Sequence, residues 1–123
     1  MLKLKVLIID DEVDYCRILE NYFKRRNYEV FLSFVLKDGL NQLDQLKPDI
    51  LILDNNLPDG KGWEHVDTIV EKNPHLRIFL ISAYHQKSDP SITVSNVTIW
   101  EKPLSMTLLN ENFLDGKLNK MEN

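Results

Sequence analysis

Short apolar runs recur along the chain, and stretches with a longer apolar period separate most of them. Short runs that are hydrophobic throughout are typical of strands buried on both faces of a sheet. They predict strands at residues 6–9, 50–54 and 78–81. Residues 28–34, which have β-branched and aromatic character, and residues 97–101 predict two more strands. The run at 50–54 organises the rest, because it ends in the carboxylate of Asp54 and a turn rich in glycine and proline follows it.

Between the strands, apolar residues recur with the spacing of an amphipathic helix. The first stripe predicts a helix over residues 13–26 and consists of Tyr15, Ile18, Leu19, Tyr22 and Phe23. Cys16 lies off the centre of this stripe, so we expect it to be only partly buried. Similar spacing predicts three further helices, over residues 36–47, 63–73 and 104–116. Gly39 is a weak point in the first of these three.

Residues 85–96 are the least helical part of the chain, since they contain Asp89-Pro90 and several β-branched or small polar residues. We expect a fourth helix there to be short, distorted or absent. Elsewhere strands alternate with helices, which predicts an α/β domain whose parallel sheet is covered on both faces. We expect one domain at residues 1–116 and a flexible C-terminal tail at residues 117–123.

Polar residues end or directly follow four of the predicted strands: Asp10 and Asp11, then Asp54, then Ser82, then Lys102. In a parallel sheet all strand ends lie at one edge, so these side chains should converge. Three carboxylates brought together repel one another and raise at least one pKa. Mg²⁺ with its preference for oxygen ligands would relieve this repulsion, and Lys102 would neutralise the remaining charge. Such a site would accept a phosphoryl group.

Five elements stand at the ends of the predicted strands, in this order: Asp10-Asp11, Asp54, Pro58 with Gly62, Ser82-Ala83, and Lys102-Pro103. Together they resemble the receiver domain of two-component response regulators, over about residues 5–113. The resemblance implies a flavodoxin-like (βα)5 fold with a doubly wound, five-stranded parallel sheet in the order 2-1-3-4-5. The chain departs from it in the segment between Ser82 and Lys102, which is a little short and makes the fourth helix atypical.

The resemblance also implies a chemistry. Asp54 would be the phosphoacceptor, taking a phosphoryl group from the phosphohistidine of a sensor histidine kinase or a phosphotransfer protein. Asp10, Asp11 and Asp54 would bind Mg²⁺ together with the backbone carbonyl of Asn56, and Asp10 would act directly or through water. The domain would thus assist its own Mg²⁺-dependent phosphorylation and dephosphorylation without being a conventional enzyme.

A conformational switch is implied in the same way. Lys102 would pair with the phosphoryl oxygens, and the hydroxyl of Ser82 would move inward to hydrogen-bond one of them. This movement would change the face formed by the fourth helix, the last strand and the last helix. The family usually has Tyr or Phe three residues before the lysine, whereas this chain has Ile99, followed by Trp100. Either Trp100 takes over the switch through a local shift, or the switch runs without an aromatic ring.

Composition narrows the function classes. The 123 residues carry a net charge of −4 with a pI near 5.3, and no basic stripe offsets the acids, so direct nucleic-acid binding is not expected. Cys16 is the only cysteine, which excludes an internal disulfide and a cysteine-rich zinc site. No apolar run is long enough to span a membrane, and the protein is expected to be cytoplasmic.

Two other function classes remain as alternatives. One is a pseudo-receiver, a protein-interaction module without a phosphorylation cycle, which Ile99 and residues 85–96 favour and the intact acids oppose. The other is a flavin carrier or a hydrolase of similar fold. No glycine-rich phosphate loop follows the first strand, and Asn56 stands where an aspartate-nucleophile phosphatase has a second acid. A homodimer that depends on phosphorylation is a further expectation, whereas no residue identifies the cognate kinase or the downstream effector.

Overall fold

The computed structural model describes residues 3–83 and 96–113. In chain order the elements are β1 (Lys5–Ile9), α1 (Val13–Arg25), β2 (Glu29–Ser33), α2 (Leu36–Leu46), β3 (Ile50–Asp54), β4 (Asn56–Leu57), β5 (Gly60–Lys61), the 3-10 helix η1 (Gly62–His65), α3 (Val66–Lys72), β6 (Arg77–Ser82), β7 (Val97–Glu101) and α4 (Met106–Asn112). All five predicted strands are present. The expectation of an atypical fourth helix falls on residues 84–95, which lie outside the described residues.

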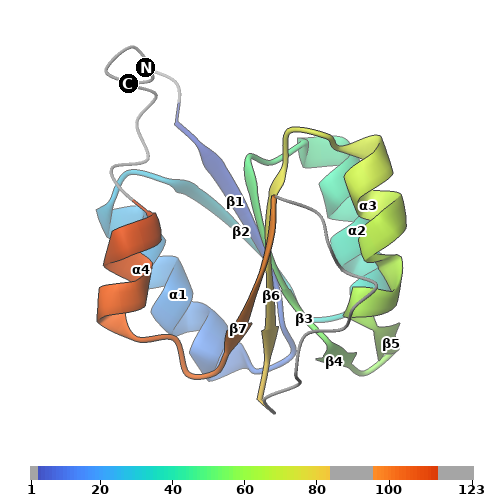
Figure 1. Ribbon diagram of the computed structural model, residues 1–123. Helices are drawn as coiled ribbons and strands as arrows, with labels where there is room; N and C mark the ends of the chain where they lie inside the picture. Colours follow the sequence, from blue (N-terminus) through green and yellow to red (C-terminus); the bar gives the residue numbers. More distant parts are fainter. Residues whose placement is uncertain (1–2, 84–95, 114–123) are drawn as a thin grey trace.

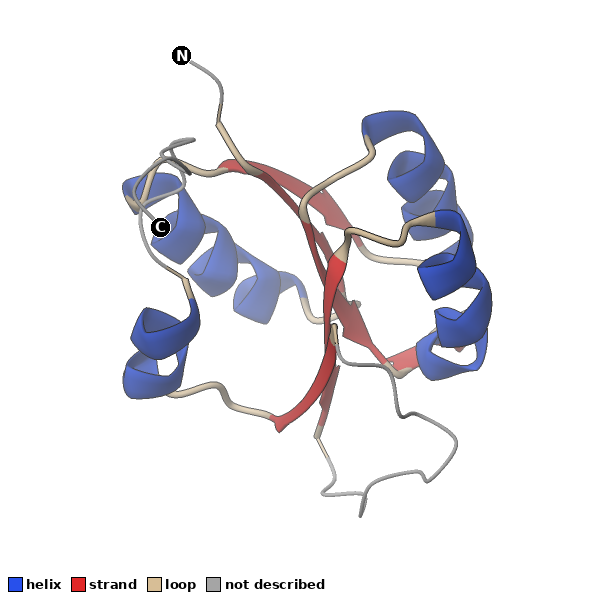
Figure 2. Ribbon diagram, turned by 45° about the horizontal axis from the view of Figure 1, so that its top comes forward, coloured by secondary structure: helices blue, strands red, loops and turns tan. Residues whose placement is uncertain are grey.

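Five of the strands form one parallel sheet in the order β2-β1-β3-β6-β7. Counted along the main sheet, this is the predicted order 2-1-3-4-5. Helices α1 and α4 cover one face of the sheet and α2 and α3 cover the other (Figure 1; Figure 2). The chain therefore has the doubly wound, flavodoxin-like architecture, in which ligands bind beyond the carboxyl ends of the strands.

Two hydrophobic clusters fill the space between the sheet and its helices. In β3 the side chains alternate between them: Ile50 and Ile52 belong to the cluster under α1 and α4, whereas Leu51 and Leu53 belong to the cluster under α2 and α3. All five residues of β3 are buried. This explains why the strand is apolar throughout instead of alternating with polar residues.

Helix α1 corrects the predicted apolar stripe. Ile18 was expected inside but is 65% exposed, whereas Cys16 is fully buried. The buried face runs through Cys16, Leu19, Tyr22 and Phe23, so the helix is rotated relative to the stripe that hydrophobicity alone suggests. The Cys16 thiol donates a hydrogen bond to the carbonyl oxygen of Asp10 at 3.2 Å, which explains how a small polarisable side chain occupies this inner position.

Gly39, which lowers the helix propensity of α2, lies directly against the sheet. A Cβ atom at this position would lie 2.5 Å from Cδ1 of Ile9, which is closer than real carbon atoms approach. The absent side chain therefore allows α2 to pack directly against β1. The tight contact matters for the site, because Ile9 is the last residue of β1 and Asp10 follows it.

The last helix is shorter than predicted. It begins at Met106, where the hydroxyl of Ser105 accepts a hydrogen bond from the backbone N–H of Leu108 at 3.0 Å, and it ends at Asn112. Phe113 is already extended, with φ −127° and ψ 108°, because its ring is buried against the sheet. The expected end near Gly116 is therefore wrong. None of the helices in the described ranges has the length and apolarity needed to cross a bilayer.

Candidate functional site

The register of the sheet brings the predicted site residues to one edge. Ile9 pairs with Leu53, so Asp10 follows β1 at the level of Asp54 on β3. On the other side, Asp54 pairs with Ile81, and the next residue of β6 is Ser82. The backbone N–H of Lys102 donates to the carbonyl oxygen of Ser82 at 2.9 Å, which ties the segment after β7 to the same edge.

Strand periodicity then places three of these side chains on one face. Asp10, Asp54 and Lys102 each stand two residues after a member of the cluster under α1 and α4, namely Ile8, Ile52 and Trp100. Because successive side chains of a strand alternate between faces, the two carboxylates and the lysine are directed to the side of the sheet that α1 covers. By the same alternation, the Ser82 side chain belongs to the opposite face of the sheet, and Ser82 is 2% exposed.

Three carboxylates form a compact cluster at this edge. One oxygen from each of Asp10, Asp11 and Asp54 lies within 4.8 Å of the others. Asp10 is fully buried and Asp54 is 4% exposed, whereas Asp11 is exposed. Burial, and then the charge of Asp10, raise the pKa of Asp54 to about 6, and burial also raises the pKa of Asp10. The cluster therefore carries excess negative charge that a cation would relieve.

The ammonium of Lys102 supplies one cation to the cluster. Its Nζ atom lies 2.7 Å from Oδ2 of Asp10, 2.5 Å from Oε1 of Glu12 and 3.7 Å from Oδ1 of Asp54. The ring of Tyr15 lies below it, with the ring centroid at 5.0 Å. Burial opposes the charge of Lys102, but the Asp10 and Glu12 carboxylates outweigh burial and raise the pKa of this lysine.

Glu12 was not among the predicted site residues. Sequence reasoning assigned Asp10 and Asp11 to the site and passed over the third acid of the same run, although it is adjacent to them. The structure places Glu12 at the N-cap of α1, where its side chain makes no capping hydrogen bond and instead contacts Lys102. Asp10 Oδ1 accepts the backbone N–H of Glu12 at 2.9 Å, so one of the two predicted acids does support the start of α1.

The chain after Asp54 is held in place by a small hairpin. Strands β4 and β5 pair antiparallel, and Gly62 N–H donates to the carbonyl oxygen of Asn55 at 3.0 Å. The Asn55 side chain accepts the N–H of Trp63 at 3.1 Å. A side chain on Gly62 would collide with the backbone oxygen of Asp54. Glycine at this position is therefore what lets the hairpin pack against the end of β3.

Asn56, the remaining predicted metal ligand, lies in this hairpin. Its side-chain Oδ1 atom accepts a hydrogen bond from Nζ of Lys61 at 2.7 Å. The carboxylate of Asp59, also in the hairpin, accepts the backbone N–H groups of Leu36 and Lys37 at 2.7 and 2.8 Å and so caps α2. The assignment of the Asn56 backbone carbonyl to the metal stays a prediction.

The two residues at the expected switch position face opposite sides of the sheet. Ile99 packs with the cluster under α2 and α3, whereas Trp100 packs with the cluster under α1 and α4. The Trp100 ring stacks on Phe79 with centroids 4.5 Å apart and meets Phe113 edge-on at 6.0 Å. In this structure Trp100 therefore does not lie on the face that Ile99 occupies. The switch roles of both residues stay predictions.

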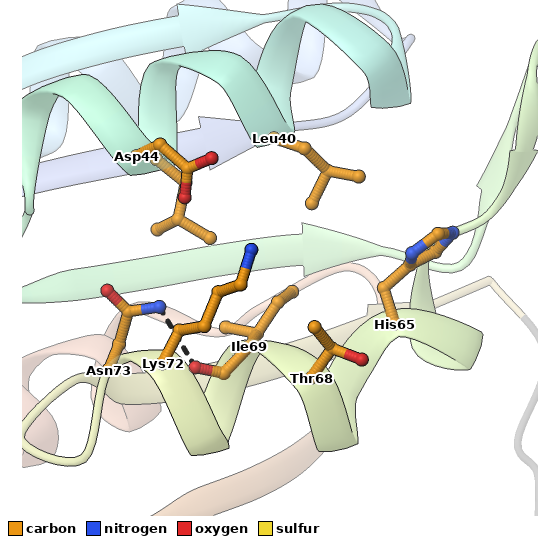
Figure 3. Close-up of a pocket in the computed structure, with 8 residues that line it drawn as sticks. Leu40, Asp44, His65, Thr68, Ile69, Lys72 and Asn73 are labelled. Atoms are coloured by element: carbon orange, nitrogen blue, oxygen red, sulfur yellow. Dashed lines mark hydrogen bonds between the residues drawn. The ribbon is translucent and has the colours of Figure 1, made fainter.

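A pocket of about 220 Å³ lies between α2 and α3 (Figure 3). Its lining residues are Leu40, Leu43, Asp44, His65, Thr68, Ile69, Lys72 and Asn73. Its floor is aliphatic, and the groups of three or more metal-binding side chains found in the described ranges do not include its acid or its histidine. This pocket is thus a weaker candidate for phosphoryl or metal chemistry than the acidic edge of the sheet.

The acidic edge fits a hard divalent cation. Its donors are carboxylate oxygens, which Mg²⁺ prefers, and no nitrogen or sulfur ligand belongs to the group. Oδ2 of Asp10 is buried, and its charge is met by the Lys102 ammonium at 2.7 Å.

Comparison with known proteins agrees with this geometry. The family model described as the response regulator receiver domain matches residues 6–111. The chain is 32% identical to the chemotaxis protein CheY of Listeria monocytogenes over 87 residues, which are 68% of this chain and 71% of that protein. It is 36% identical to the regulatory protein VanR of Enterococcus faecium over 76 residues, which are 62% of this chain but only 33% of that protein.

Solved structures agree on the fold. A CheY-like receiver domain protein from Methanospirillum hungatei superposes with a TM-score of 0.79 at 19% identity, covering 89% of this chain and 90% of the other. The chemotaxis protein CheY4 of Vibrio cholerae gives a TM-score of 0.78 at 19% identity, covering 89% and 95%. With the family match and the acidic pocket at the strand ends, these findings show that the chain belongs to the response regulator receiver domain family.

Proposed function

We propose that this domain is a phosphorylation-controlled signalling switch in which Asp54 accepts a phosphoryl group from the phosphohistidine of a sensor histidine kinase or a phosphotransfer protein. The observation that carries the proposal is the convergence of Asp10, Asp11, Asp54 and Lys102, which come from three different strand ends. A nearly buried carboxylate beside two further acids and one lysine supports acceptance of a dianionic group more strongly than it supports a structural role.

In the proposed reaction, an Oδ atom of Asp54 attacks the phosphorus atom of the phosphohistidine. The new P–O bond forms as the P–N bond breaks, and the electron pair of that bond leaves with the imidazole nitrogen. Asp54 must be ionised to attack, and with a pKa of about 6 it is largely ionised at neutral pH. The ammonium of Lys102, 3.7 Å from Asp54, would pair with the phosphoryl oxygens and offset their charge.

Asp10, Asp11 and Asp54, together with the backbone carbonyl of Asn56, would hold Mg²⁺. When bound, this ion would supply positive charge for the phosphoryl oxygens in the transition state. Asp10 is suited to a fixed role because it is fully buried and its Oδ1 atom is already held by the N–H of Glu12. Asp11 is exposed and can adjust to the incoming group.

The proposed output starts at Ser82. Its hydroxyl would move to a phosphoryl oxygen, and the hydrogen bond from Lys102 N–H to the Ser82 carbonyl couples this strand end to the segment after β7. The packing of the partly buried Trp100 on the side opposite to Ile99 favours a switch that runs without an aromatic ring at this strand. The same observation favours the second candidate function, a pseudo-receiver that binds partners without a phosphorylation cycle.

Phosphoryl incorporation separates the two functions. The protein is incubated with radiolabelled phosphoramidate, a small phosphodonor, in Mg²⁺ and in excess chelator. We expect label in Mg²⁺ only, none in Asp54→Asn, and normal labelling in Asp44→Asn, a matched change at an exposed aspartate of α2. Absence of label in the wild type, with the fold intact, would favour the pseudo-receiver. Equal labelling of Asp54→Asn and the wild type would rule out Asp54 as the acceptor.

A further inference from the structure

We propose that Glu12 is a positioning residue that competes with the phosphoryl group for Lys102 and thereby slows phosphorylation of Asp54. This inference rests on the proposed function, since the phosphoryl oxygens are what Glu12 would compete with. It adds a fourth acid to the site, one whose contact is made with the lysine and not with the three-carboxylate cluster.

The distances show which partner holds Lys102 in the resting arrangement. Its Nζ atom lies 2.5 Å from Oε1 of Glu12 but 3.7 Å from Oδ1 of Asp54. The contact with Glu12 is a hydrogen bond between two charged groups, whereas the distance to Asp54 is too long for one. The lysine is therefore drawn toward the β1–α1 corner and away from the atom that would receive the phosphoryl group.

Burial indicates which of the two short contacts can be exchanged. The Asp10 side chain is fully buried, so its ion pair with Lys102 cannot be given up without leaving a buried charge. The Glu12 side chain is 60% exposed, so its carboxylate can return to water at little cost. Because Glu12 makes no capping hydrogen bond in α1, releasing Lys102 does not require the helix to change.

The consequence is a competition for one ammonium group. An arriving phosphoryl group must draw Lys102 from the carboxylate of Glu12, and the free energy of that contact is subtracted from the stabilisation that Lys102 gives. For a partly exposed ion pair the penalty corresponds to a rate lower by about three- to fivefold. Removing the contact should therefore accelerate phosphorylation by this factor, although the substitution adds no new interaction with the phosphoryl group.

The test measures the rate of labelling from phosphoramidate at saturating Mg²⁺, so that changes in metal affinity do not enter. Glu12→Gln removes the charge, whereas Glu12→Asp keeps the charge on a side chain one methylene shorter. Asp14→Asn removes one charge from the exposed first turn of α1 and serves as the matched control. We expect both Glu12 variants to be faster by about three- to fivefold and Asp14→Asn to match the wild type. A wild-type rate in Glu12→Asp, or an equal acceleration in Asp14→Asn, would show a general charge effect and overturn the proposal.

A second measurement examines the contact without metal or phosphodonor. The unfolding equilibrium in urea is measured for Glu12→Gln, Lys102→Met and the double variant. We expect the effects of the two substitutions on the unfolding constant to be non-additive by about three- to fivefold. Additive effects would show that Glu12 and Lys102 are not in contact in the unphosphorylated protein, which would overturn the proposal. If the wild type is labelled and the Glu12 variants are labelled at the same rate, the competition alone is overturned. If neither the wild type nor any variant is labelled, the proposed function and the competition are overturned together.

Discussion

The Nζ atom of Lys102 lies 3.7 Å from Oδ1 of Asp54, although one residue follows β7 and the other ends β3. The pair is possible because β6 separates the two strands and its end, Ser82, receives the backbone N–H of Lys102. The lysine thus reaches across one strand to the carboxylate cluster. The fold therefore brings together a lysine and a carboxylate that are distant in the sequence.

Replacing Lys102 by methionine should destabilise the metal-free protein at neutral pH by about 2–4 kcal/mol, because it leaves the buried Asp10 carboxylate without its cation. Mg²⁺ should restore part of this loss by supplying positive charge to the same carboxylates. The free energy of unfolding in urea, with and without Mg²⁺, measures both effects. Lys72→Met, a change at an exposed lysine, is the control; an equal loss in both variants would contradict the assignment of Lys102 to the cluster.

The raised pKa of Asp54 predicts a specific pH dependence. With a folded-state pKa of about 6 and an ordinary value of 3.8, the carboxyl group favours the folded state when protonated. This contribution is fully present below the ordinary pKa and is lost as the pH rises through about 6. In metal-free buffer Asp54→Asn should therefore be more stable than the wild type by about 1–3 kcal/mol at pH 8, and the difference should vanish near pH 3.5. A constant difference across this range would contradict the raised pKa.

The affinity for Mg²⁺ should also depend on the protonation of Asp54. Protons and the cation compete for Asp54, so the dissociation constant of Mg²⁺ should rise as the pH falls through about 6. Calorimetric titration between pH 5 and 8 measures this change. Asp44→Asn should follow the wild-type curve, since its carboxylate lies on α2 outside the cluster. An affinity independent of pH would mean that the metal binds elsewhere.

Gly39→Ala should destabilise the protein by about 1–3 kcal/mol, although alanine is the better helix former. The added methyl group would lie against the side chain of Ile9, which has no room to move in the buried β1 strand. The melting temperature measures the effect. Combining Gly39→Ala with Ile9→Val, which removes one methyl group from the contact, should recover part of the loss. A more stable Gly39→Ala would indicate that the helix is not packed as closely as the structure shows.

The two tryptophans should report differently on the site. The backbone N–H of Trp63 donates a hydrogen bond to the side chain of Asn55, which follows Asp54 directly, whereas Trp100 is partly buried and stacks on Phe79. Adding beryllium fluoride with Mg²⁺, as a mimic of the phosphoryl group, should change the fluorescence of Trp63. The change should persist in Trp100→Phe and be lost in Trp63→Phe. The reverse result would show that the signal travels through β7 to Trp100.

Much of the fold could be predicted because its signals are local. Strands β1, β3 and β6 each contain a run of apolar residues, and β3 combines burial on both faces with a carboxylate at its end. Convergence of Asp10, Asp54 and Lys102 followed from the rule that parallel strands end at one edge. These inferences required only the order of the elements, not the details of packing.

What could not be predicted depends on contacts between elements. Hydrophobicity placed Ile18 inside and Cys16 at the margin, whereas the orientation of α1 against the sheet reverses the two. The need for glycine at position 39 arises from the side chain of Ile9, which is distant in the sequence. Glu12 was passed over because its role comes from the reach of Lys102 toward the β1–α1 corner. Periodicity along one segment does not contain this information.

The measurement that tests the account most directly is the location of the phosphoryl group. The wild-type protein is treated with phosphoramidate and Mg²⁺ and then with borohydride, which reduces an aspartyl phosphate to homoserine, and its peptides are sequenced by tandem mass spectrometry. The account predicts homoserine at position 54, and only there, and none when Mg²⁺ is chelated. Homoserine at Asp10, Asp11 or another acid, with Asp54 unchanged, would contradict it.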